Sequence, residues 1–424
     1  MKPLTIAIAG LGGRGRGCYG TFSLRYKDRC KVVAVADPIV SKQEEAMNTF
    51  GLGKEAVYNN AADLLAVDKL ADILVVATPD DDHYQTSMAA LHKGYDLLLE
   101  KPIAVTEKEC IEITQTAEKL GRKVMVCHVL RYSPFFARMK DIIKSGEIGE
   151  VVHTTVLENV GYWHQAHSFV RGNWGNTAEC CPMILAKCCH DADLILWLMD
   201  KPVKKVSSNG GLYYFRPDKA PQGATPRCTD GCTARDNCPY DAEKIYITDP
   251  KNGVANGSPG WYVTVPVAPF PPTVENVTEA LKTGPYGRCV FQCGNDVVDH
   301  QVVNFEFADG ATAHLTMAAF SHDSYRYIQI MGTLGVIEGD MRDHIIKMNR
   351  FGEEVVEIDT QVECAIAGHG GGDIVMFEDL LDYVSGEGDA LSLTSISNSL
   401  DSHLVCFAAE RSRLNGGTSE SIGV

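Results

Sequence analysis

The sequence lacks the features that would place this chain in a membrane, on a nucleic acid or outside the cell. No apolar run approaches the ~18 residues that a membrane-spanning helix needs. Basic residues are not in excess, since the net charge is −16, whereas nucleic acids and anionic membranes attract basic surfaces. The N-terminus shows no export signal, because Met1–Pro3 leads directly into an apolar segment that the fold requires as a strand. We therefore expect a cytoplasmic protein that binds neither nucleic acids nor membranes.

A framework of disulfide bonds is not expected without an export signal. The 15 cysteines are nonetheless many for 424 residues. Most stand in apolar contexts, where a small buried thiol is the simplest interpretation; among them are Cys18, Cys30, Cys110, Cys127 and Cys406. The composition, 45% hydrophobic and 22% charged, is that of a globular protein. A chain of this length exceeds one typical core, so we predict two domains.

The first residues contain the pattern of a dinucleotide-binding turn. An apolar run over residues 4–9 ends in GLGGRG, in which Gly10, Gly12 and Gly15 fit G-x-G-x-x-G. Gly10 permits a tight turn, Gly12 lets the backbone approach a pyrophosphate, and Gly15 lets the helix pack on the strand. The helix that follows directs its N-terminal amides at the phosphates. We therefore predict that this turn, including Gly13, binds a dinucleotide.

An acidic residue follows the second apolar strand, residues 31–36. Asp37 lies 22 residues after Gly15, where a carboxylate binds the ribose hydroxyls of NAD and repels the additional phosphate of NADP. Arg14 and Arg16 leave this choice open, because they could contact the pyrophosphate or accommodate a 2′-phosphate. We predict NAD as the cofactor rather than NADP.

Strands and helices continue to alternate to about residue 127. Further strands are expected at residues 73–77, 96–99 and 123–127, and helices at 82–93 and 106–120. This order predicts an α/β fold whose N-terminal domain, residues 1–127, is a Rossmann domain with a doubly wound parallel sheet. Ligands bind beyond the carboxyl ends of such strands. The residues at those ends are expected to face one crevice: Asp37, Thr78, Pro79 and Lys101.

The second half, residues 128–424, has a different pattern. After a helix at residues 134–145, strands are expected at 151–158, 299–307, 312–319, 327–331, 335–340 and 345–348. With a helix at 182–199 they predict an α+β domain with an open, mainly antiparallel sheet, which follows the Rossmann domain. Residues at about 208–298 form an insertion rich in Gly, Pro, Asp and Cys, which is long for a loop without structure.

Lys101 lies in the tripeptide Glu100-Lys101-Pro102, directly after an expected strand. This position places an ammonium group beside a bound nicotinamide. Proline restricts Lys101 to extended geometry and allows a cis peptide bond. In isolation the tripeptide is more typical of a surface lysine before a loop proline, and the functional interpretation gains weight only from the histidine helix expected at residues 182–199.

The apolar helix expected at residues 182–199 contains His190. Lys187 and His190 lie three residues apart and therefore on one face. A histidine in such a helix is most often a packing residue, but the neighbouring Lys187 and Asp191 argue for function because buried charges need partners. We predict His190 as a catalytic residue, Lys187 as a further catalytic candidate and Asp191 as a substrate contact.

Together these motifs resemble the glucose–fructose oxidoreductase / inositol dehydrogenase / MocA (Gfo/Idh/MocA) family. The glycine turn, Asp37, the stretch ATPDDDH at residues 77–83, Glu-Lys-Pro and the histidine helix match in order and spacing, over essentially the whole chain except the insertion. The resemblance implies an NAD(P)-binding domain and a C-terminal domain whose sheet often forms a homo-oligomer interface, here of a dimer or tetramer. It implies that Lys101 binds the reacting oxygen and that His190 is the general acid/base. Thr78, Pro79, His83 and Glu100 are further candidates for cofactor contacts.

The sequence departs from this family beside His190. Family dehydrogenases usually carry an aspartate four residues before the histidine and another three after it. Asp193 matches the second, whereas Ala186 stands in place of the first. The partner that orients His190 is therefore missing or comes from elsewhere. A nearby ammonium group would lower the imidazole pKa and keep it able to accept a proton.

A segment rich in aromatic residues, ENVGYWHQAHSFVRGNW, lies between the first expected strand of the second domain and the histidine helix. Aromatic rings can cover the C–H faces of a sugar or polyol while polar side chains bind its hydroxyls. The alternative is an irregular surface loop with buried anchors. We predict substrate contacts from Tyr162, Trp163, His164, His167, Arg171 and Trp174. Arg171 could also bind a carboxylate, so a sugar acid remains among the candidates.

Cysteines recur in the insertion with short spacings. Cys228, Cys232 and Cys238 follow C-x3-C-x5-C, and Cys289 and Cys293 form another C-x3-C. This turn-rich stretch is expected to bury little apolar surface, and a structural Zn²⁺ would supply the core it lacks. We predict zinc ligands Cys228, Cys232, Cys238 and Cys293, with Cys289 as the alternative fourth. Reduced packing thiols are the competing interpretation.

Three functions remain in competition. The first is an NAD-dependent oxidoreductase that oxidises a hydroxyl of a sugar, glycoside or inositol, with proton transfer to His190. The second is an NAD-dependent glycoside hydrolase that works by transient oxidation at C3, elimination and re-reduction; the family includes such enzymes, whose glycine turn also carries Arg-Gly, as at residues 14–15. The third, a non-catalytic NAD(H)-binding regulator, predicts the loss of Lys101 or His190, and both are present.

Overall fold

A computed structural model describes residues 2–265, 271–361, 369–387 and 393–422. The N-terminal domain contains a six-stranded sheet in the order β3-β2-β1-β4-β5-β6, and every neighbouring pair is parallel. Its strands are β1 Leu4–Ala9, β2 Cys30–Ala36, β3 Val57–Tyr58, β4 Ile73–Val76, β5 Asp96–Leu99 and β6 Val124–Val126. This strand order is that of the Rossmann fold, as predicted.

Helices cover both faces of this sheet because its strands are apolar on both sides. On one face, Leu64, Leu91 and Ile113 pack against Ala7 and neighbouring strand residues. The helices of the domain are α1 Thr21–Arg25, α2 Val40–Phe50, α3 Ala61–Ala66, α4 His83–His92 and α5 Glu107–Leu120. α5 begins where expected, since the Thr106 side chain accepts a hydrogen bond from the Glu109 amide at 3.3 Å.

The second domain contains a nine-stranded sheet in the order β14-β13-β12-β11-β7-β10-β9-β8-β15. Among the described strands of this second sheet only β7 and β10 pair in parallel, so the predicted open, mainly antiparallel sheet is confirmed. Its strands are β7 Val151–Gly161, β8 Val203–Gly211, β9 His300–Phe307, β10 Thr312–Ser321, β11 Tyr325–Gly332, β12 Gly335–Asp340, β13 Ile345–Arg350, β14 Val356–Asp359 and β15 Glu420–Ser421. The sequence did not indicate β8, β14 or β15.

The helix expected at residues 182–199 is broken in the structure. It consists of α8 Met183–Ala186 and α9 Cys189–Met199, with Lys187 and Cys188 between them. The other helices of the second half are α6 Pro134–Ser145, α7 Tyr162–His164, α10 Trp261–Thr264, α11 Val274–Thr283, α12 Gly372–Ser385 and α13 Ile396–Leu414. No described helix is long and apolar enough to cross a membrane.

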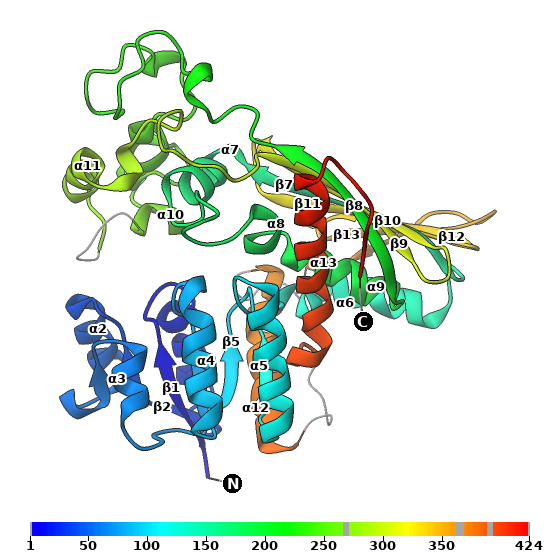
Figure 1. The fold of residues 1–424 in the computed structure, drawn as a ribbon, viewed down its shortest axis with the longest axis horizontal. Coiled ribbons are helices and arrows are strands. Elements are labelled where there is room, and N and C mark those ends of the chain that lie inside the picture. The colour runs from blue at the N-terminus through cyan, green and yellow to red at the C-terminus, as the bar shows by residue number, and fades with distance from the viewer. Residues whose placement is uncertain (1, 266–270, 362–368, 388–392, 423–424) are drawn as a thin grey trace.

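The C-terminal part of the chain returns to the first domain. In Figure 1 α12 (orange) is drawn behind α5, and it packs on the face of the parallel sheet opposite to α5. Phe377 and Leu380 of α12 pack with Ile8 and Val35 of the sheet and Phe22 of α1 in one apolar cluster. The second face of the Rossmann sheet is therefore covered partly by a helix from far along the chain.

The insertion has a core of its own, contrary to the expectation that it would bury little apolar surface. Its buried residues form one cluster that includes Phe215, Tyr246, Val263, Leu281 and Phe291. Figure 1 shows this part, with α10 and α11, on the side of α7 away from the nine-stranded sheet. Aromatic residues spaced along the turns bury the apolar surface of this core. The many Gly and Pro residues of the insertion gave no indication of it.

Candidate functional site

The glycine turn between β1 and α1 has the geometry that a dinucleotide requires. Gly10 has φ +93°, and a Cβ there would lie 2.2 Å from the carbonyl oxygen of Ala77. A Cβ at Gly15 would lie 1.9 Å from the Gly10 carbonyl oxygen. Gly12 and Gly13, by contrast, face open space. Two glycines are thus required for close packing within the protein, and the other two leave room for a pyrophosphate.

Asp37 lies at the carboxyl end of β2, and its carboxylate faces the glycine turn. Oδ2 accepts a hydrogen bond from the Leu11 amide at 2.8 Å, and Oδ1 accepts one from the Ile39 amide at 2.9 Å. The Lys42 ammonium lies 3.7 Å from Oδ2. Two backbone amides therefore fix the carboxylate at the position predicted for a ribose contact.

Arg14 is engaged by carboxylates of the protein itself. Its Nε donates to Glu100 Oε1 at 2.5 Å, its Nη2 donates to Asp373 Oδ1 at 2.8 Å, and it also contacts the Tyr19 hydroxyl. Burial raises the pKa of Glu100, but Arg14 and Tyr19 outweigh this effect and lower it overall. Glu100 is thus a structural anion under the turn, and Arg14 is already neutralised by two acids.

Thr78 and Pro79 follow β4, and His83 opens α4 behind them. The His83 ring is fully buried; its Nδ1 lies 2.7 Å from the Pro102 carbonyl oxygen and its Nε2 lies 3.1 Å from that of Thr78. His83 therefore links the loop after β4 to the loop after β5, which contains Lys101. The peptide bond between Lys101 and Pro102 is cis.

The Lys101 side chain reaches the second domain. Its Nζ donates to the Ala186 carbonyl oxygen at 2.8 Å. Because α8 ends at Ala186, this carbonyl is available to accept a hydrogen bond from outside the helix. Burial lowers the Lys101 pKa, but Cys189, Asp80 and Glu100 raise it above its usual value. The side chain is therefore an ammonium group at the junction of the two domains.

His190 is buried beside this ammonium group. Its pKa is lowered well below 6.5, first by burial and then by the charge of Lys101, with a further contribution from His128. The His190 ring lies against those of His128 and His369, at centroid distances of 5.7 and 6.0 Å. Its Nδ1 is buried without a hydrogen-bond partner among the described residues. The imidazole is therefore neutral and has a nitrogen available to accept a proton.

Two histidines near His190 were missed by the sequence reasoning. His128 follows β6, and a polar residue at the carboxyl end of a parallel strand is a signal that could have identified it. His369 hydrogen-bonds Asp373 at 2.9 Å, and Asp373 also binds Arg14. No sequence pattern links His369 to the site, because it lies far along the chain, just before α12.

Lys187 and Asp191 belong to a buried network of four charges. Lys187 Nζ lies 3.0 Å from Glu158 Oε1, and Arg326 pairs with Glu158 at 3.0 Å and with Asp191 at 2.7 Å. Burial raises the Asp191 pKa to about 6 despite the charge of Arg326. Asp193 instead forms two hydrogen bonds with Arg131, at 2.5 and 2.7 Å. Neither acid hydrogen-bonds His190.

The predicted substrate residues divide into two groups. His164 and Trp174 lie toward the junction: Lys187 and Lys101 contribute to the low pKa of His164, after burial, and Trp174 Nε1 donates to Asp80 at 2.7 Å. Trp163 packs against the insertion, where its ring stacks on that of Tyr262 with the centroids 4.5 Å apart. Tyr162 and His167 face the insertion, where Tyr162 contacts the Tyr240 ring and His167 binds the Tyr246 hydroxyl at 2.9 Å.

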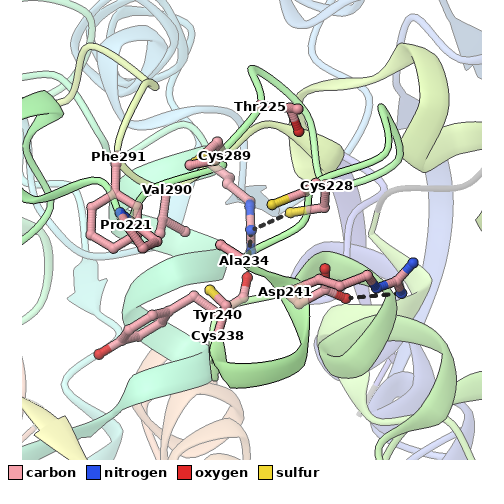
Figure 2. Close-up of a pocket in the computed structure, with 14 residues that line it drawn as sticks. Pro221, Thr225, Cys228, Ala234, Cys238, Tyr240, Asp241, Cys289, Val290 and Phe291 are labelled. Carbon is pink, nitrogen blue, oxygen red and sulfur yellow. Dashed lines mark hydrogen bonds and ion pairs between the residues drawn. The ribbon is translucent and has the colours of Figure 1, made fainter.

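Arg171 also points into the insertion and lines a pocket that contains four of the predicted zinc ligands. These are Cys228, Cys232, Cys238 and Cys289, and Figure 2 shows three of them, Cys228, Cys238 and Cys289, around that pocket. Cys293 instead donates to the Cys289 carbonyl oxygen at 3.2 Å. Among the described residues, the one group of three metal-capable side chains within 4.8 Å of one another is Asp80, Cys180 and Cys181. The thiols of the insertion are more widely spaced.

Comparisons with known proteins agree with this architecture. Residues 4–128 match the family described as "Oxidoreductase family, NAD-binding Rossmann fold". Residues 140–417 match "Oxidoreductase family, C-terminal alpha/beta domain". The two models cover nearly the whole chain and extend across the insertion.

Relatives of known sequence match parts of the chain. YteT of Bacillus subtilis, which carries the provisional name of an oxidoreductase, is 26% identical over 73% of this chain and 72% of its own length. Inositol 2-dehydrogenase/D-chiro-inositol 3-dehydrogenase of Lactiplantibacillus plantarum is 33% identical over 28% of this chain and 34% of its own length. A glycosyl hydrolase family 109 protein of Shewanella pealeana is 27% identical over 36% of this chain and 34% of its own length.

Solved structures share the fold over the whole chain. Levoglucosan dehydrogenase, solved with NADH and levoglucosan, has a TM-score of 0.71 at 15% identity and covers 100% of both chains. The WlbA dehydrogenase of Chromobacterium violaceum, solved with NADH and UDP-GlcNAcA, has a TM-score of 0.68 at 16% identity over 100% of this chain and 97% of its own. Since both family models match in order, the chain belongs to the Gfo/Idh/MocA family of oxidoreductases, with an N-terminal NAD-binding Rossmann domain.

Proposed function

We propose that this protein is an NAD-dependent oxidoreductase that oxidises a hydroxyl group of a sugar, glycoside or inositol. The observation that carries the proposal is the convergence of Lys101 and His190 from the two domains. Lys101 lies after β5 of the NAD-binding domain and hydrogen-bonds the end of α8, and its charge acts on His190 at the start of α9. An ammonium group and a neutral imidazole are what the oxidation of an alcohol requires from a protein.

In this proposal each residue has one role. His190 accepts the hydroxyl proton as the carbon loses its hydride, and the Lys101 ammonium stabilises the charge that develops on the oxygen. NAD, when bound, supplies the hydride acceptor. Gly12 and Gly13 leave space for its pyrophosphate, and Asp37 binds its ribose.

The substrate class rests on the residues at the junction and on the family. His164 lies near the basic groups Lys101 and Lys187, and its ring stacks with that of Trp163, with the centroids 5.4 Å apart. Rings of this kind pack on the C–H faces of a carbohydrate, and polar groups bind its hydroxyls. The names of the inositol and levoglucosan dehydrogenases point to the same class of substrate.

The cofactor preference is tested at Asp37. Asp37→Ala is expected to weaken NAD binding by about 10-fold or more, because the ribose loses a charged hydrogen-bond partner. NADP binding should weaken less or improve, since the variant no longer repels the 2′-phosphate. Dissociation constants for both cofactors, measured by quenching of protein fluorescence, check this. Tighter binding of NADP than NAD by the wild-type protein would contradict the assignment.

The route of the hydride separates the oxidoreductase from the NAD-dependent glycoside hydrolase. With a substrate deuterated at the reacting carbon, we expect the deuterium on the nicotinamide and NADH formed in amounts equal to the oxidised product. A hydrolase would return the deuterium to the sugar, release the aglycone without net NADH and place solvent deuterium on the adjacent carbon. The match to a glycosyl hydrolase family 109 protein makes this control necessary.

The acid side of the pH profile reports on the proton acceptor. Because burial, Lys101 and His128 lower the His190 pKa well below 6.5, the neutral base persists into mildly acidic solution. The Lys101 pKa is raised, so its charge persists in mildly alkaline solution. We therefore expect kcat/KM to stay constant from about pH 6.5 to 9 and to fall only at lower pH. An acidic limb centred above pH 6.5 would count against a buried, unpaired His190 as the base.

A further inference from the structure

Two distant cysteine segments of the insertion are joined by the backbone. The Cys228 amide donates to the Gly287 carbonyl oxygen at 3.0 Å, and the Cys289 amide donates to that of Pro226 at 2.9 Å. Arg227 and Arg288 form an antiparallel bridge between these two contacts. Cys228 and Cys289 are therefore neighbours in space, although 61 residues separate them in the sequence (289 minus 228).

Cys232 and Cys238 complete the group of thiols. Both line the same pocket as Cys228 and Cys289, and Figure 2 shows Cys238 on the same pocket as these two residues. Cys293 is not among the residues that line this pocket, and its thiol donates a hydrogen bond to the Cys289 carbonyl oxygen at 3.2 Å. The structure thus selects Cys289 over Cys293 as the fourth member, a choice that the spacing left open.

The pocket also contains a buried cation that lacks an anionic partner. Arg171 is 1% exposed. Its Nε and Nη2 donate to the carbonyl oxygens of Arg288 and Tyr240, and Nη2 lies 3.6 Å from Cys228 Sγ. Among the described residues Nη1 has no hydrogen-bond partner, and no carboxylate pairs with the guanidinium. The pocket also contains the buried carboxylate of Asp241, but Asp241 pairs with Arg235 at 3.6 Å and not with Arg171. A buried charge without a direct counter-charge is costly, so thiolates in place of thiols would stabilise Arg171.

We propose that Cys228, Cys232, Cys238 and Cys289 bind a structural Zn²⁺ and that Arg171 is the counter-charge of this centre. On binding, four thiols release four protons and form four Zn–S bonds, so the centre carries a net charge of −2. Arg171 then lies against thiolate sulfurs, which accept hydrogen bonds from its unpaired Nη1. Zn–S bonds are about 2.3 Å long, so the metal draws the sulfur atoms together through rotation about χ1.

The zinc centre stabilises the segment from which we expect contacts to the substrate. Arg171 ends a helical turn, Gln165–Arg171, that follows Trp163 and His164 directly. His167 in the same turn binds Tyr246 of the insertion. Loss of the metal is therefore expected to raise KM for the sugar while leaving NAD binding unchanged, because the glycine turn and Asp37 lie in the other domain.

The test is metal analysis of the whole protein purified without chelators. We expect one zinc per chain. Cys228→Ser and Cys289→Ser should each lower the zinc content at least 5-fold, whereas the matched controls Cys293→Ser and Cys110→Ser should keep it. Protein exchanged into Co²⁺ should show the visible absorption of a tetrahedral thiolate site.

A second measurement covers variants that fail to fold. Removal of zinc from the wild-type protein by a chelator should lower the Tm and expose four additional reactive thiols, and added Zn²⁺ should reverse both changes. The proposal is overturned if the purified protein and the protein supplied with Zn²⁺ both contain less than about 0.2 zinc per chain. It is also overturned if the four cysteines form disulfides, if another metal occupies the site, or if Cys289→Ser retains zinc while Cys293→Ser loses it.

Discussion

Replacement of Lys101 or His190 by alanine is expected to lower kcat by ~10²-fold or more, with the NAD dissociation constant nearly unchanged. Lys101→Ala removes the cation that stabilises the developing oxygen charge, and His190→Ala removes the proton acceptor. Neither side chain belongs to the glycine turn or contacts Asp37. Steady-state turnover with a polyol and NAD, together with direct NAD titration, measures both quantities.

Matched controls separate these effects from general damage. Lys108 and His92 are exposed helix residues of the NAD-binding domain, and their alanine variants should retain wild-type turnover. If His190→Ala retained near wild-type kcat, His190 would be a packing residue and His164 or Lys187 would become the candidate base. Lys187 is the weaker of these two, since its ammonium group already pairs with buried Glu158.

Glu100 is adjacent to Lys101 in the sequence but does not neutralise the Lys101 ammonium group, because other side chains bind the Glu100 carboxylate. Glu100 precedes Lys101, yet its Oε1 accepts hydrogen bonds from Arg14 at 2.5 Å and from Tyr19 at 2.6 Å. Asp373 of α12 holds Arg14 from the other side. The glycine turn, the loop after β5 and α12 therefore share one network of ion pairs, which leaves the Lys101 ammonium directed at the second domain.

The Rossmann half was predictable because its signals are local. Five of its six strands are short apolar runs, whereas the two-residue β3 was not indicated by the sequence. Functional residues follow strand ends, as Asp37 follows β2 and Lys101 follows β5. In parallel sheets the carboxyl ends of the strands meet at one edge. The positions of the strands in the sequence therefore predict which residues face the crevice. The contribution of α12 to the same core was not predictable, since its contacts join residues more than 300 positions apart, such as Phe22 and Phe377.

The site residues of the second half were less predictable because ion pairs between residues far apart in the sequence determine where their side chains lie. The spacing of Lys187 and His190 suggested one helical face, but the helix breaks between them and Lys187 pairs with Glu158 of β7 instead. Asp193 matched the family pattern, yet it binds Arg131. The turn-rich composition of the insertion suggested that it has little core, whereas scattered aromatic residues supply one.

Asp191→Ala is expected to lower the free energy of unfolding by roughly 3–5 kcal/mol. The network contains two cations, Lys187 and Arg326, and two anions, Glu158 and Asp191. Removal of one anion leaves a surplus positive charge in a buried site, which is more costly than the loss of the contact itself. Denaturant unfolding measures the change. The ion pair between Lys201 and the exposed Asp309 is the control, and Asp309→Ala should cost less than about 1 kcal/mol.

Charge balance predicts the behaviour of the double variant. Asp191→Leu/Arg326→Leu removes one anion and one cation and leaves Lys187 paired with Glu158, so it should be more stable than Asp191→Leu alone. The same comparison separates the structural interpretation of Asp191 from the substrate contact that the sequence suggested. A substrate contact predicts a higher KM for the sugar with unfolding unchanged within about 1 kcal/mol, and no rescue by Arg326→Leu. If Asp191 is instead a structural charge, Asp191→Leu should lower the free energy of unfolding and leave KM unchanged. Arg326→Leu should then restore stability, because the cost of Asp191→Leu lies in the unpaired Arg326 guanidinium.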